Sequence, residues 1–305
     1  MRNFFKIFLF ILGLISTAQA QQDAMYSQYV FNMMAINPAY TGNRNAISAS
    51  AFYRSQWSGI DGAPRTGNVT VQSPLNGERM GLGIQVFDDR LGITSTTGAI
   101  GSYAYHLTLN NEAKLSFGLQ ASAMQYKANY GSVDLGSGAA IDPAFSQNVS
   151  KTIANAGAGA FYHTEKFYAG LSALDLLPNK LNENTELSAR QVPHFFFTTG
   201  YVFPVGEDFK FKPSVLVKAV KGAPVEGDIQ ATFWIKDFIS VGGLYRTNAD
   251  VSGLLGIQVS PQFYLGYAYD ASTTALKRFN SGSHEIMIRY EFSFDRNKIL
   301  SPRFF

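Results

Sequence analysis

Four histidines are the side chains of this sequence best suited to metal binding or acid–base chemistry: His106, His163, His194 and His284. None lies two or four residues from another histidine, the spacing at which imidazoles of one strand or helix share a metal ion. The His284-Glu285 pair does not continue as the H-E-x-x-H zinc motif, because Ile occupies position 288. The chain has no cysteine, which excludes thiol nucleophiles and disulfides. The pattern therefore does not favour a metal site.

Nucleophile and phosphate-binding motifs are also missing. The sequence has no G-x-S-x-G elbow, no G-x-G-x-x-G turn and no G-K-[ST] loop. Folding can still bring a serine and a histidine together, so a membrane-embedded hydrolase stays open as the weakest alternative. We expect a protein that is not an enzyme and holds no cofactor.

Two terminal segments carry side chains suited to protein contacts. They are residues 21–45, interpreted as a periplasmic segment or a plug, and the periplasmic tail 295–305. In the tail, Pro302 prevents strand continuation and Arg303 offers a bidentate partner for a carboxylate. The structural alternatives are ordering the barrel floor or plugging the lumen for the first segment and a frayed tail for the second. The candidate partner-binding residues are Tyr26, Gln28, Tyr29, Asn37, Pro38, Ser301, Pro302, Arg303, Phe304 and Phe305.

The first twenty residues predict export. Arg2 and Lys6 precede the apolar run from Phe8 to Ile15, and Ala18-Gln19-Ala20 is a small-residue cleavage site. This arrangement is typical of a cleaved signal peptide over residues 1–20. Removing two of 25 basic residues and none of 22 acidic residues leaves a net charge of +1. That balance does not favour a nucleic-acid partner.

The elements that must position these residues are strands. Apolar residues alternate with small or polar ones from residue 46 to residue 294, as at 79–86, 114–121, 209–218, 228–235 and 285–294. A period of two predicts strands with one apolar and one polar face. A β-sandwich shows the same alternation. However, segments of about 10 residues match a tilted membrane crossing, and aromatic residues near strand ends suit the two bilayer interfaces.

Turn and loop lengths predict the topology. Short turns are expected at 76–77, 110–111, 164–165, 205–207, 236–237 and 260–261, with longer connections at 58–64, 88–92, 128–151, 175–191, 221–225, 247–250 and 271–282. Strict alternation of short and long connections is typical of outer-membrane barrels. The sequence thus predicts an all-β, up-and-down antiparallel transmembrane barrel of about 14 strands with both termini periplasmic. The weakest predicted strands are 94–109 and 152–163.

The inward-facing row is expected to be charged. Residues of both signs alternate with the apolar face, and mutual ion pairing and packing is a simpler interpretation than a selective pore. Fourteen strands lie between filled and water-filled barrels, so the lumen must hold water, side chains or a plug. The residues concerned are Lys114, Lys210, Lys212, Lys218, Asp228, Glu285, Arg289 and Glu291.

The mature chain resembles the PorP/SprF outer-membrane proteins of the type IX secretion system and gliding machinery of Bacteroidota. One departure is Leu177-Pro178, where a more polar pair is expected. The resemblance is carried by the order and spacing of Ser27-Gln28-Tyr29, Phe31-Asn32, Asn37-Pro38-Ala39-Tyr40, Gly42, Gly200-Tyr201-Val202-Phe203, Lys212-Pro213-Ser214, Ala223-Pro224, Asp228, Gly243, Tyr245-Arg246, Gly266-Tyr267-Ala268-Tyr269-Asp270 and Gly282-Ser283-His284-Glu285-Ile286-Met287.

This resemblance implies a non-catalytic secretion component embedded in outer-membrane lipid. It implies two kinds of partner: a periplasmic peptidoglycan-binding protein with secretion-ring components, or a secreted adhesin or sorting-domain cargo that the protein helps to export or attach. The sequence leaves open whether the chain is a shared core component or is dedicated to one cargo. The alternative function is an outer-membrane diffusion channel or hydrophobic-substrate transporter.

Overall fold

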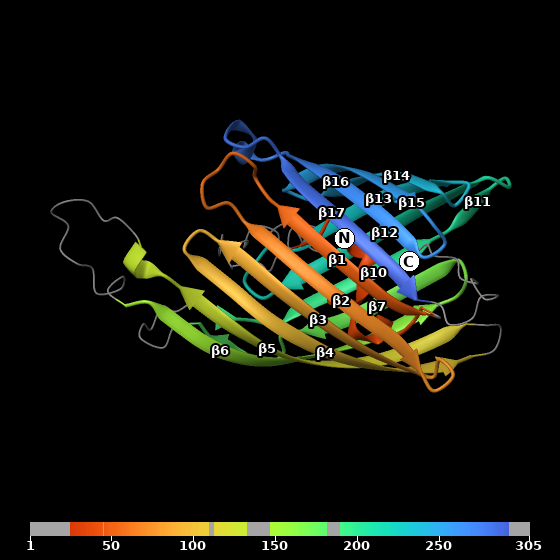
Figure 1. The fold of residues 1–305 in the computed structure, drawn as a ribbon, viewed down its shortest axis with the longest axis horizontal. Helices are drawn as coiled ribbons and strands as arrows, with labels where there is room; N and C mark the ends of the chain where they lie inside the picture. Colours follow the sequence, from red (N-terminus) through yellow and green to blue (C-terminus); the bar gives the residue numbers. More distant parts are fainter. Residues whose placement is uncertain (1–24, 45, 110–112, 133–146, 182–189, 293–305) are drawn as a thin grey trace, which may run out of the picture.

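The computed structural model describes residues 25–44, 46–109, 113–132, 147–181 and 190–292. Its main feature is a closed antiparallel barrel in which each wall strand pairs with its neighbour in sequence (Figure 1). Strand β1 (Ile47–Ser55) pairs with β17 (Ser283–Phe292), which closes the ring. β10 (His194–Tyr201) and β11 (Phe203–Val205) both pair with β12 and form one interrupted strand. The ring therefore has fourteen strands, which confirms the predicted fold class.

The remaining wall strands continue around the ring in chain order. None of the helices in the described ranges is long and apolar enough to cross a membrane. The wall strands are β2 (Arg65–Leu75), β3 (Met80–Leu91), β4 (Thr94–Thr108), β5 (Lys114–Ala128), β6 (Val149–His163), β7 (Phe167–Leu174), β12 (Phe209–Val220), β13 (Glu226–Ile235), β14 (Ile239–Arg246), β15 (Asp250–Gln258) and β16 (Phe263–Ser272).

The alternation of side chains sorts each strand into a lumen row and a lipid-facing row. In β17 the buried row carries Glu285, Met287 and Arg289, while Ile286 and Ile288 are exposed on the other face. Closure pairs the backbone groups of every wall strand, which a hydrocarbon environment requires. Exposed aromatic residues gather where β10 to β13 approach their short turns and where β17 ends, among them Tyr201, Phe203, Phe209, Phe233, Tyr290 and Phe292.

The seven connections on one end of the barrel, here called the loop end, do not all have the predicted length. The prediction of a long connection at 88–92 is wrong, because Asp88 to Leu91 continue β3 and only two residues turn the chain. Thr97 donates a hydrogen bond to Asp88 across 2.7 Å, and Thr66 donates one to Asp89 across 2.6 Å. These hydrogen bonds to neighbouring strands thus extend β3 beyond the point at which its composition predicts an end. The connection at 247–249 is also short.

The opposite end is here called the turn end, and its fully described connections are short. Within the described ranges these are 76–79, 164–166, 206–208, 236–238 and 259–262. The predicted turn at 110–111, the centres of the loops 128–151 and 175–191, and the predicted strand end at Phe294 lie partly or wholly outside the described residues. β17 is described as far as Phe292.

Short helices and strands lie in the loops and in the lumen. Five 3-10 helices are described: η1 (Tyr29–Phe31), η2 (Met33–Ala35), η3 (Pro38–Tyr40), η5 (Tyr130–Ser132) and η7 (Ala275–Arg278). Strands β8 (Asn179–Lys180) and β9 (Arg190–Gln191) pair with each other in the connection between β7 and β10. The first three helices lie inside the barrel and build its buried apolar core around Tyr29, Met33, Met34 and Tyr40.

Candidate functional site

Residues 25–44, here called the plug, fill the lumen. Met25 lines one cavity near the loop end together with Thr66, Asp89 and Thr96, whereas Arg44 contacts Glu291 near the turn end. The plug therefore runs lengthwise through the barrel, and its three one-turn helices are joined by local backbone hydrogen bonds. Such short helices have little stability of their own, so contacts with the wall must order the plug.

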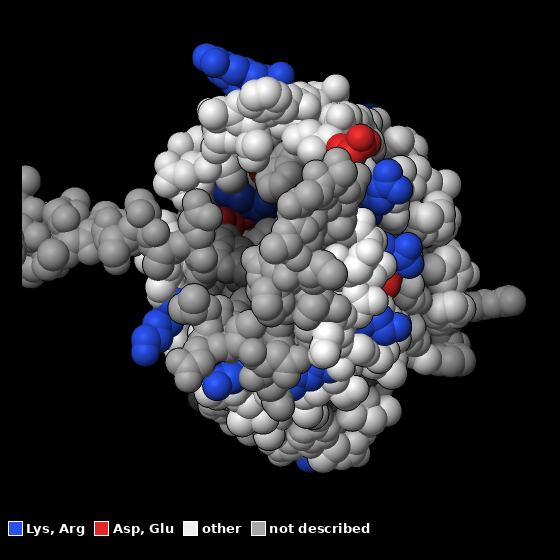
Figure 2. Space-filling view, turned by 90° about the vertical axis from the view of Figure 1, so that its left-hand side faces the viewer, with Lys and Arg blue, Asp and Glu red and all other residues white. Residues whose placement is uncertain are grey.

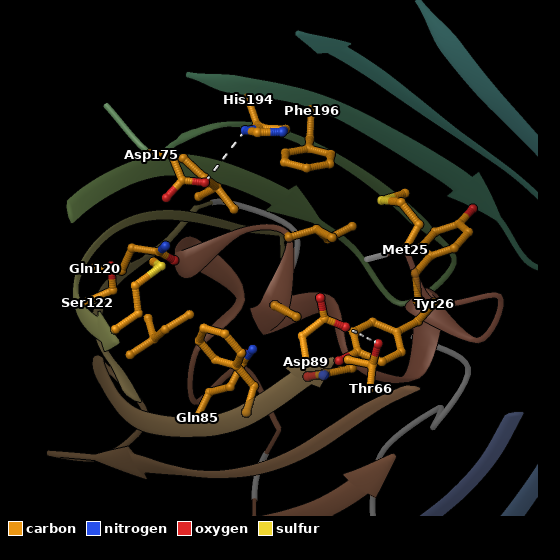
Figure 3. Close-up of a pocket in the computed structure, with 18 of the residues that line it drawn as sticks. Met25, Tyr26, Thr66, Gln85, Asp89, Gln120, Ser122, Asp175, His194 and Phe196 are labelled. Carbon is orange, nitrogen blue, oxygen red and sulfur yellow. Dashed lines mark hydrogen bonds and ion pairs between the residues drawn. The ribbon is translucent and has the colours of Figure 1, made fainter. Parts of the chain in front are cut away.

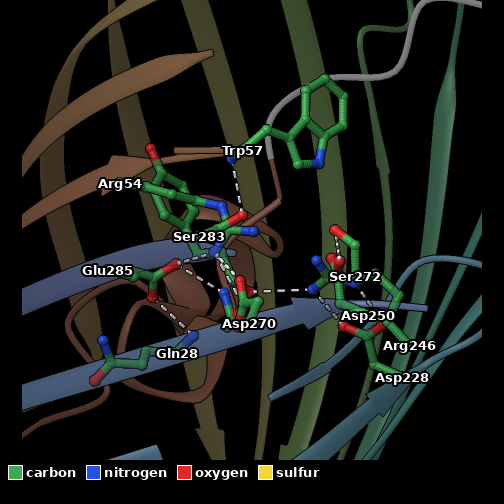
Figure 4. Close-up of polar contacts among 12 residues, drawn as sticks. Gln28, Arg54, Trp57, Asp228, Arg246, Asp250, Asp270, Ser272, Ser283 and Glu285 are labelled. Atoms are coloured by element: carbon green, nitrogen blue, oxygen red, sulfur yellow. Dashed lines mark hydrogen bonds and ion pairs between the residues drawn. The ribbon is translucent and has the colours of Figure 1, made fainter. Parts of the chain in front are cut away.

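Near the loop end a buried charge cluster holds the plug (Figure 4). The Arg54 guanidinium lies 2.5 Å from Asp270 and 3.1 Å from Glu285, and all three side chains are almost completely buried. Glu285 accepts hydrogen bonds from the backbone N–H groups of Ser27 and Gln28, each across 2.9 Å. The Ser27 hydroxyl donates to Asp270 at the same distance. One arginine and two carboxylates from three strands thus bind the start of the plug.

A second buried pair extends this cluster along the wall. Arg246 binds Asp228 through two hydrogen bonds of 2.9 and 2.8 Å, the bidentate geometry that guanidinium and carboxylate groups favour. The carbonyl oxygen of Tyr26 accepts a further, longer bond from Arg246. The loop-end cluster is defined as Arg54, Asp228, Arg246, Asp270 and Glu285.

In its middle the plug is held by a different chemistry. The Asn37 amide donates to the carbonyl oxygens of Ala160 and Leu171 at 3.0 and 3.2 Å, so one side chain bridges β6 and β7. Its oxygen accepts the N–H of Ala39 at 3.0 Å and caps η3, where Pro38 takes the first helical position. The Ile36 carbonyl accepts a hydrogen bond from Ser172. This part of the plug is fixed by neutral backbone hydrogen bonds.

Glycines in the wall allow the plug to come this close. A Cβ at Gly118 would overlap the backbone of Ala39, and one at Gly81 would overlap the carbonyl of Thr41. Gly159 faces the Asn37 amide in the same way. Because backbone packs directly on backbone here, a larger residue at these positions forces the plug or the wall to move.

At the turn end the plug finishes in a third contact. Arg44 lies 2.5 Å from Glu291, whose carboxylate also lies 3.3 Å from Arg289. The Arg289 guanidinium stacks 5.6 Å from the ring centre of Phe31 and 5.0 Å from that of Tyr264. These cation–π contacts join the plug to β16 and β17.

Above the plug, a cavity of about 180 Å³ faces the loop end (Figure 3). The plug supplies its floor, and His194 lies 3.6 Å from Asp175 at its side. Figure 2, which views this end, shows charged side chains at the bottom of a hollow. Burial raises the pKa of Tyr26 and of Tyr29, so both phenols stay neutral. The lining mixes apolar and polar groups, including Met25, Tyr26, Tyr29, Phe87, Ile100, Met124, Phe196, Asp89, Gln120, Asp175, His194 and Lys218.

The structure places the five N-terminal candidate residues together inside the barrel. Tyr26, Gln28, Tyr29, Asn37 and Pro38 are all buried, and they contact the wall or the rest of the plug. The five C-terminal candidates, Ser301, Pro302, Arg303, Phe304 and Phe305, lie outside the described residues.

Sequence reasoning named Asp228 and Glu285 as inward charged residues but missed Arg54 and the glycines that also receive the plug. Arg54 was hidden as one polar position in an alternating strand, and Gly118 and Gly159 counted only as small residues. The available signal for this contact was an arginine at an inward strand position, together with a tyrosine-containing segment, 21–45, that fits no strand. Within the described residues no group of three His, Asp or Glu side chains could hold a metal ion.

Comparison with known proteins decides the family. Residues 18–290 match the model of the family described as type IX secretion system membrane protein PorP/SprF. The chain belongs to the PorP/SprF family. The match covers the plug and nearly all of the wall, so this PorP/SprF protein is an outer-membrane β-barrel and a membrane component of type IX secretion. No curated protein matches the chain.

Solved structures share the barrel fold of this PorP/SprF protein. The Ralstonia pickettii toluene transporter TbuX superimposes with a TM-score of 0.54 at 10% identity, over 92% of this chain and 98% of that one. The CymD monoaromatic hydrocarbon channel gives a TM-score of 0.52 at 12% identity, over 93% and 98% of the two chains. At this identity the likeness concerns the fold alone.

Proposed function

We propose that this protein is a non-catalytic scaffold of type IX secretion that holds other components at the outer membrane and does not conduct solutes. The observation that carries the proposal is the plug, which is bound to the wall at the loop end, in the middle and at the turn end. A lumen filled in this way leaves the two ends of the barrel as the surfaces available for partners. Family membership supplies the secretion context.

We further propose that the loop end faces the cell exterior and supports export or surface attachment of a secreted cargo. The loop end supports this role because it combines longer connections with the cavity above the plug. The described connections of the turn end are short, and at this end we propose contacts with a periplasmic peptidoglycan-binding protein and secretion-ring components.

Deleting the gene tests the proposed role. Cells without this chain should fail to display at least one secreted cargo, while uptake of small solutes stays normal. The measurement is surface proteomics of intact cells together with a growth assay on small solutes. Normal display with defective uptake would reject the scaffold and favour transport.

Single cysteines test the proposed orientation in this cysteine-free chain. Lys277→Cys lies on the exposed helix η7 at the loop end, and Lys236→Cys lies in an exposed turn at the other end. A membrane-impermeant maleimide should label only the first on intact cells, and both after the outer membrane is opened. The reverse pattern would place the turn end outside.

A hydrophobic-substrate transporter is the second candidate, favoured by the apolar part of the cavity lining, such as Phe87, Ile100 and Phe196. Transport would require the plug to leave at least one of its three anchors. Purified protein in a planar bilayer separates the two functions. The scaffold should show no steady conductance, whereas an open channel would conduct continuously.

A further inference from the structure

Charged residues are almost excluded from the lipid-facing rows of the barrel. Across the fourteen wall strands, all of which the structure describes, these rows contain four of them: Arg65, Asp88, Arg90 and Lys127. All four lie at the loop ends of β2, β3 and β5. The other lipid-facing positions of the wall are occupied by apolar residues, glycine, Ser, Thr, Gln, Tyr, Pro or His.

Strand register places the three cations in one row, with Ser95 between Arg90 and Lys127. Arg65 pairs with Arg90, Arg90 with Ser95, and Ser95 with Lys127. They therefore form one row across β2 to β5. With neighbouring strands about 4.8 Å apart, the row is about 15 Å long. We call Arg65, Arg90 and Lys127 the cation row.

The rows beneath it show where the membrane lies. In the next lipid-facing row, Asp88 pairs with Thr97 and Thr97 pairs with Gln125, and Asp88 is the charged member of that row. The row below that is apolar and consists of Val69, Val86, Ala99 and Ala123. Each row is two residues, or about 6.6 Å, further along the strand. The cation row thus stands about 13 Å along the strand from an all-apolar band, with one mixed polar row between them.

The local charge of this surface is positive. Arg90 lies 2.8 Å from Asp88, which also accepts the bond from Thr97, so these lipid-facing rows hold one carboxylate and three cations. Arg65, Arg90 and Lys127 are all exposed. The net charge of the four residues is +2.

The same level on the opposite side of the barrel is different. There the outermost lipid-facing row of β14 to β16 is uncharged and consists of Tyr245, Val251 and Ala271, and the exposed Tyr269 and Tyr267 follow one and two rows further in. Tyrosines are the usual interfacial residues of a barrel and suit any lipid. The cation row is therefore a local feature of β2 to β5 and not a general border.

We propose that the cation row binds the phosphate groups of an anionic lipid of the outer leaflet. Arginine binds phosphate through two parallel hydrogen bonds, and lysine adds a point charge. The acyl chains of the same lipid would lie on the apolar rows of Val69, Val86 and Ala123. The site holds the lipid on one side of the barrel only. This inference rests on the proposed outward orientation of the loop end, which the cysteine labelling tests separately.

Native mass spectrometry of the purified full barrel tests the site, with bisphosphorylated lipid A as the probe. The variant Arg65→Gln/Arg90→Gln/Lys127→Gln removes the row. The matched control Lys221→Gln/Lys277→Gln/Arg278→Gln removes three exposed cations from loops at the same end. We expect about a tenfold weaker lipid A adduct in the first variant and an unchanged adduct in the control. Gel mobility before and after boiling verifies folding of both.

Three further probes test whether the cation row binds the phosphate groups of lipid A. Lipid A without phosphates should bind the unaltered protein as weakly as bisphosphorylated lipid A binds the row variant, because the proposed contact is to phosphate. Equal loss of lipid A in the control variant would overturn the site, since general surface charge would then explain binding. Displacement of lipid A by millimolar inorganic phosphate would assign the row to free phosphate. A preference for phosphatidylglycerol over lipid A would assign it to the inner leaflet and overturn the proposal as well.

Discussion

The loop end and the middle of the plug are held to the wall by opposite means. At the loop end, buried ion pairs hold the plug, and Arg54 is shared by Asp270 and Glu285. In the middle, the backbone of η3 packs on wall glycines, and Asn37 bonds to backbone carbonyls. An ion cluster depends on every member keeping its charge, whereas backbone packing depends on the absence of side-chain atoms. The same plug is therefore sensitive to charge at one level and to volume at another.

The largest effect is expected at Arg54. Arg54→Met leaves Asp270 and Glu285 buried without their cation, and breaking such a pair costs about 3–5 kcal/mol. The unfolding midpoint in urea, measured in detergent micelles, should fall accordingly, while Lys236→Met at the exposed turn should change it little. Adding Asp270→Asn and Glu285→Gln to Arg54→Met should restore part of the loss, because it removes both unpaired charges, whereas the single amide oxygen of Gln can accept only one of the two plug N–H groups that Glu285 binds. A triple variant no more stable than Arg54→Met would mean that Arg54 acts through packing instead.

A methyl group in the middle should have the next largest effect. Gly118→Ala places a Cβ against the Ala39 backbone, and overpacking of this kind costs about 1–3 kcal/mol. Gly101→Ala on the neighbouring strand is the control, because its Cβ meets no atom within 4 Å. Urea unfolding should separate the two variants. Equal midpoints would show that the plug yields easily in the middle, and the contrast with the loop end would disappear.

Removing the Asn37 side chain should have a smaller effect. Asn37→Ala loses two hydrogen bonds to wall carbonyls and the cap of η3, but leaves no buried charge behind. A net loss of about 1 kcal/mol is expected, less than for Arg54→Met. A trypsin time course on the folded barrel should show faster cleavage after Arg44. Unchanged proteolysis would assign the retention of the plug to the two charged ends.

The sequence predicted the wall far better than its contents. Alternation over β3, β5 or β17 is a local signal, and the pairing of neighbours follows from short turns. The continuation of β3 through Asp88 and Arg90 was missed, since charged residues in a lipid-facing row resemble a loop until the register is known. The binding of Ser27 and Gln28 by Glu285 joins residues more than 250 positions apart. No local pattern contains that information.

The two terminal segments show the same limit of local sequence patterns, because they are similar in sequence character and differ in what can be said of their role. Both are rich in aromatic residues, and neither continues the strand pattern. The first is a buried plug in its described part, so its tyrosines serve the barrel itself. The tail from Asp295 to Phe305 lies outside the described residues and keeps its predicted role as a partner-binding segment.

Deleting residues 301–305 should have the smallest effect on stability and a selective effect on partners. The deletion removes Phe304, Phe305 and Arg303, which are groups suited to a protein contact. It leaves the wall unchanged, because the wall already closes through the pairing of β1 with β17. The urea midpoint of the purified barrel and its amount in the outer membrane should stay unchanged. Recovery of the periplasmic peptidoglycan-binding protein with the tagged barrel should fall, as should cargo display. If instead the barrel disappears from the outer membrane, the tail serves assembly, and both terminal segments then act within the protein and not on partners.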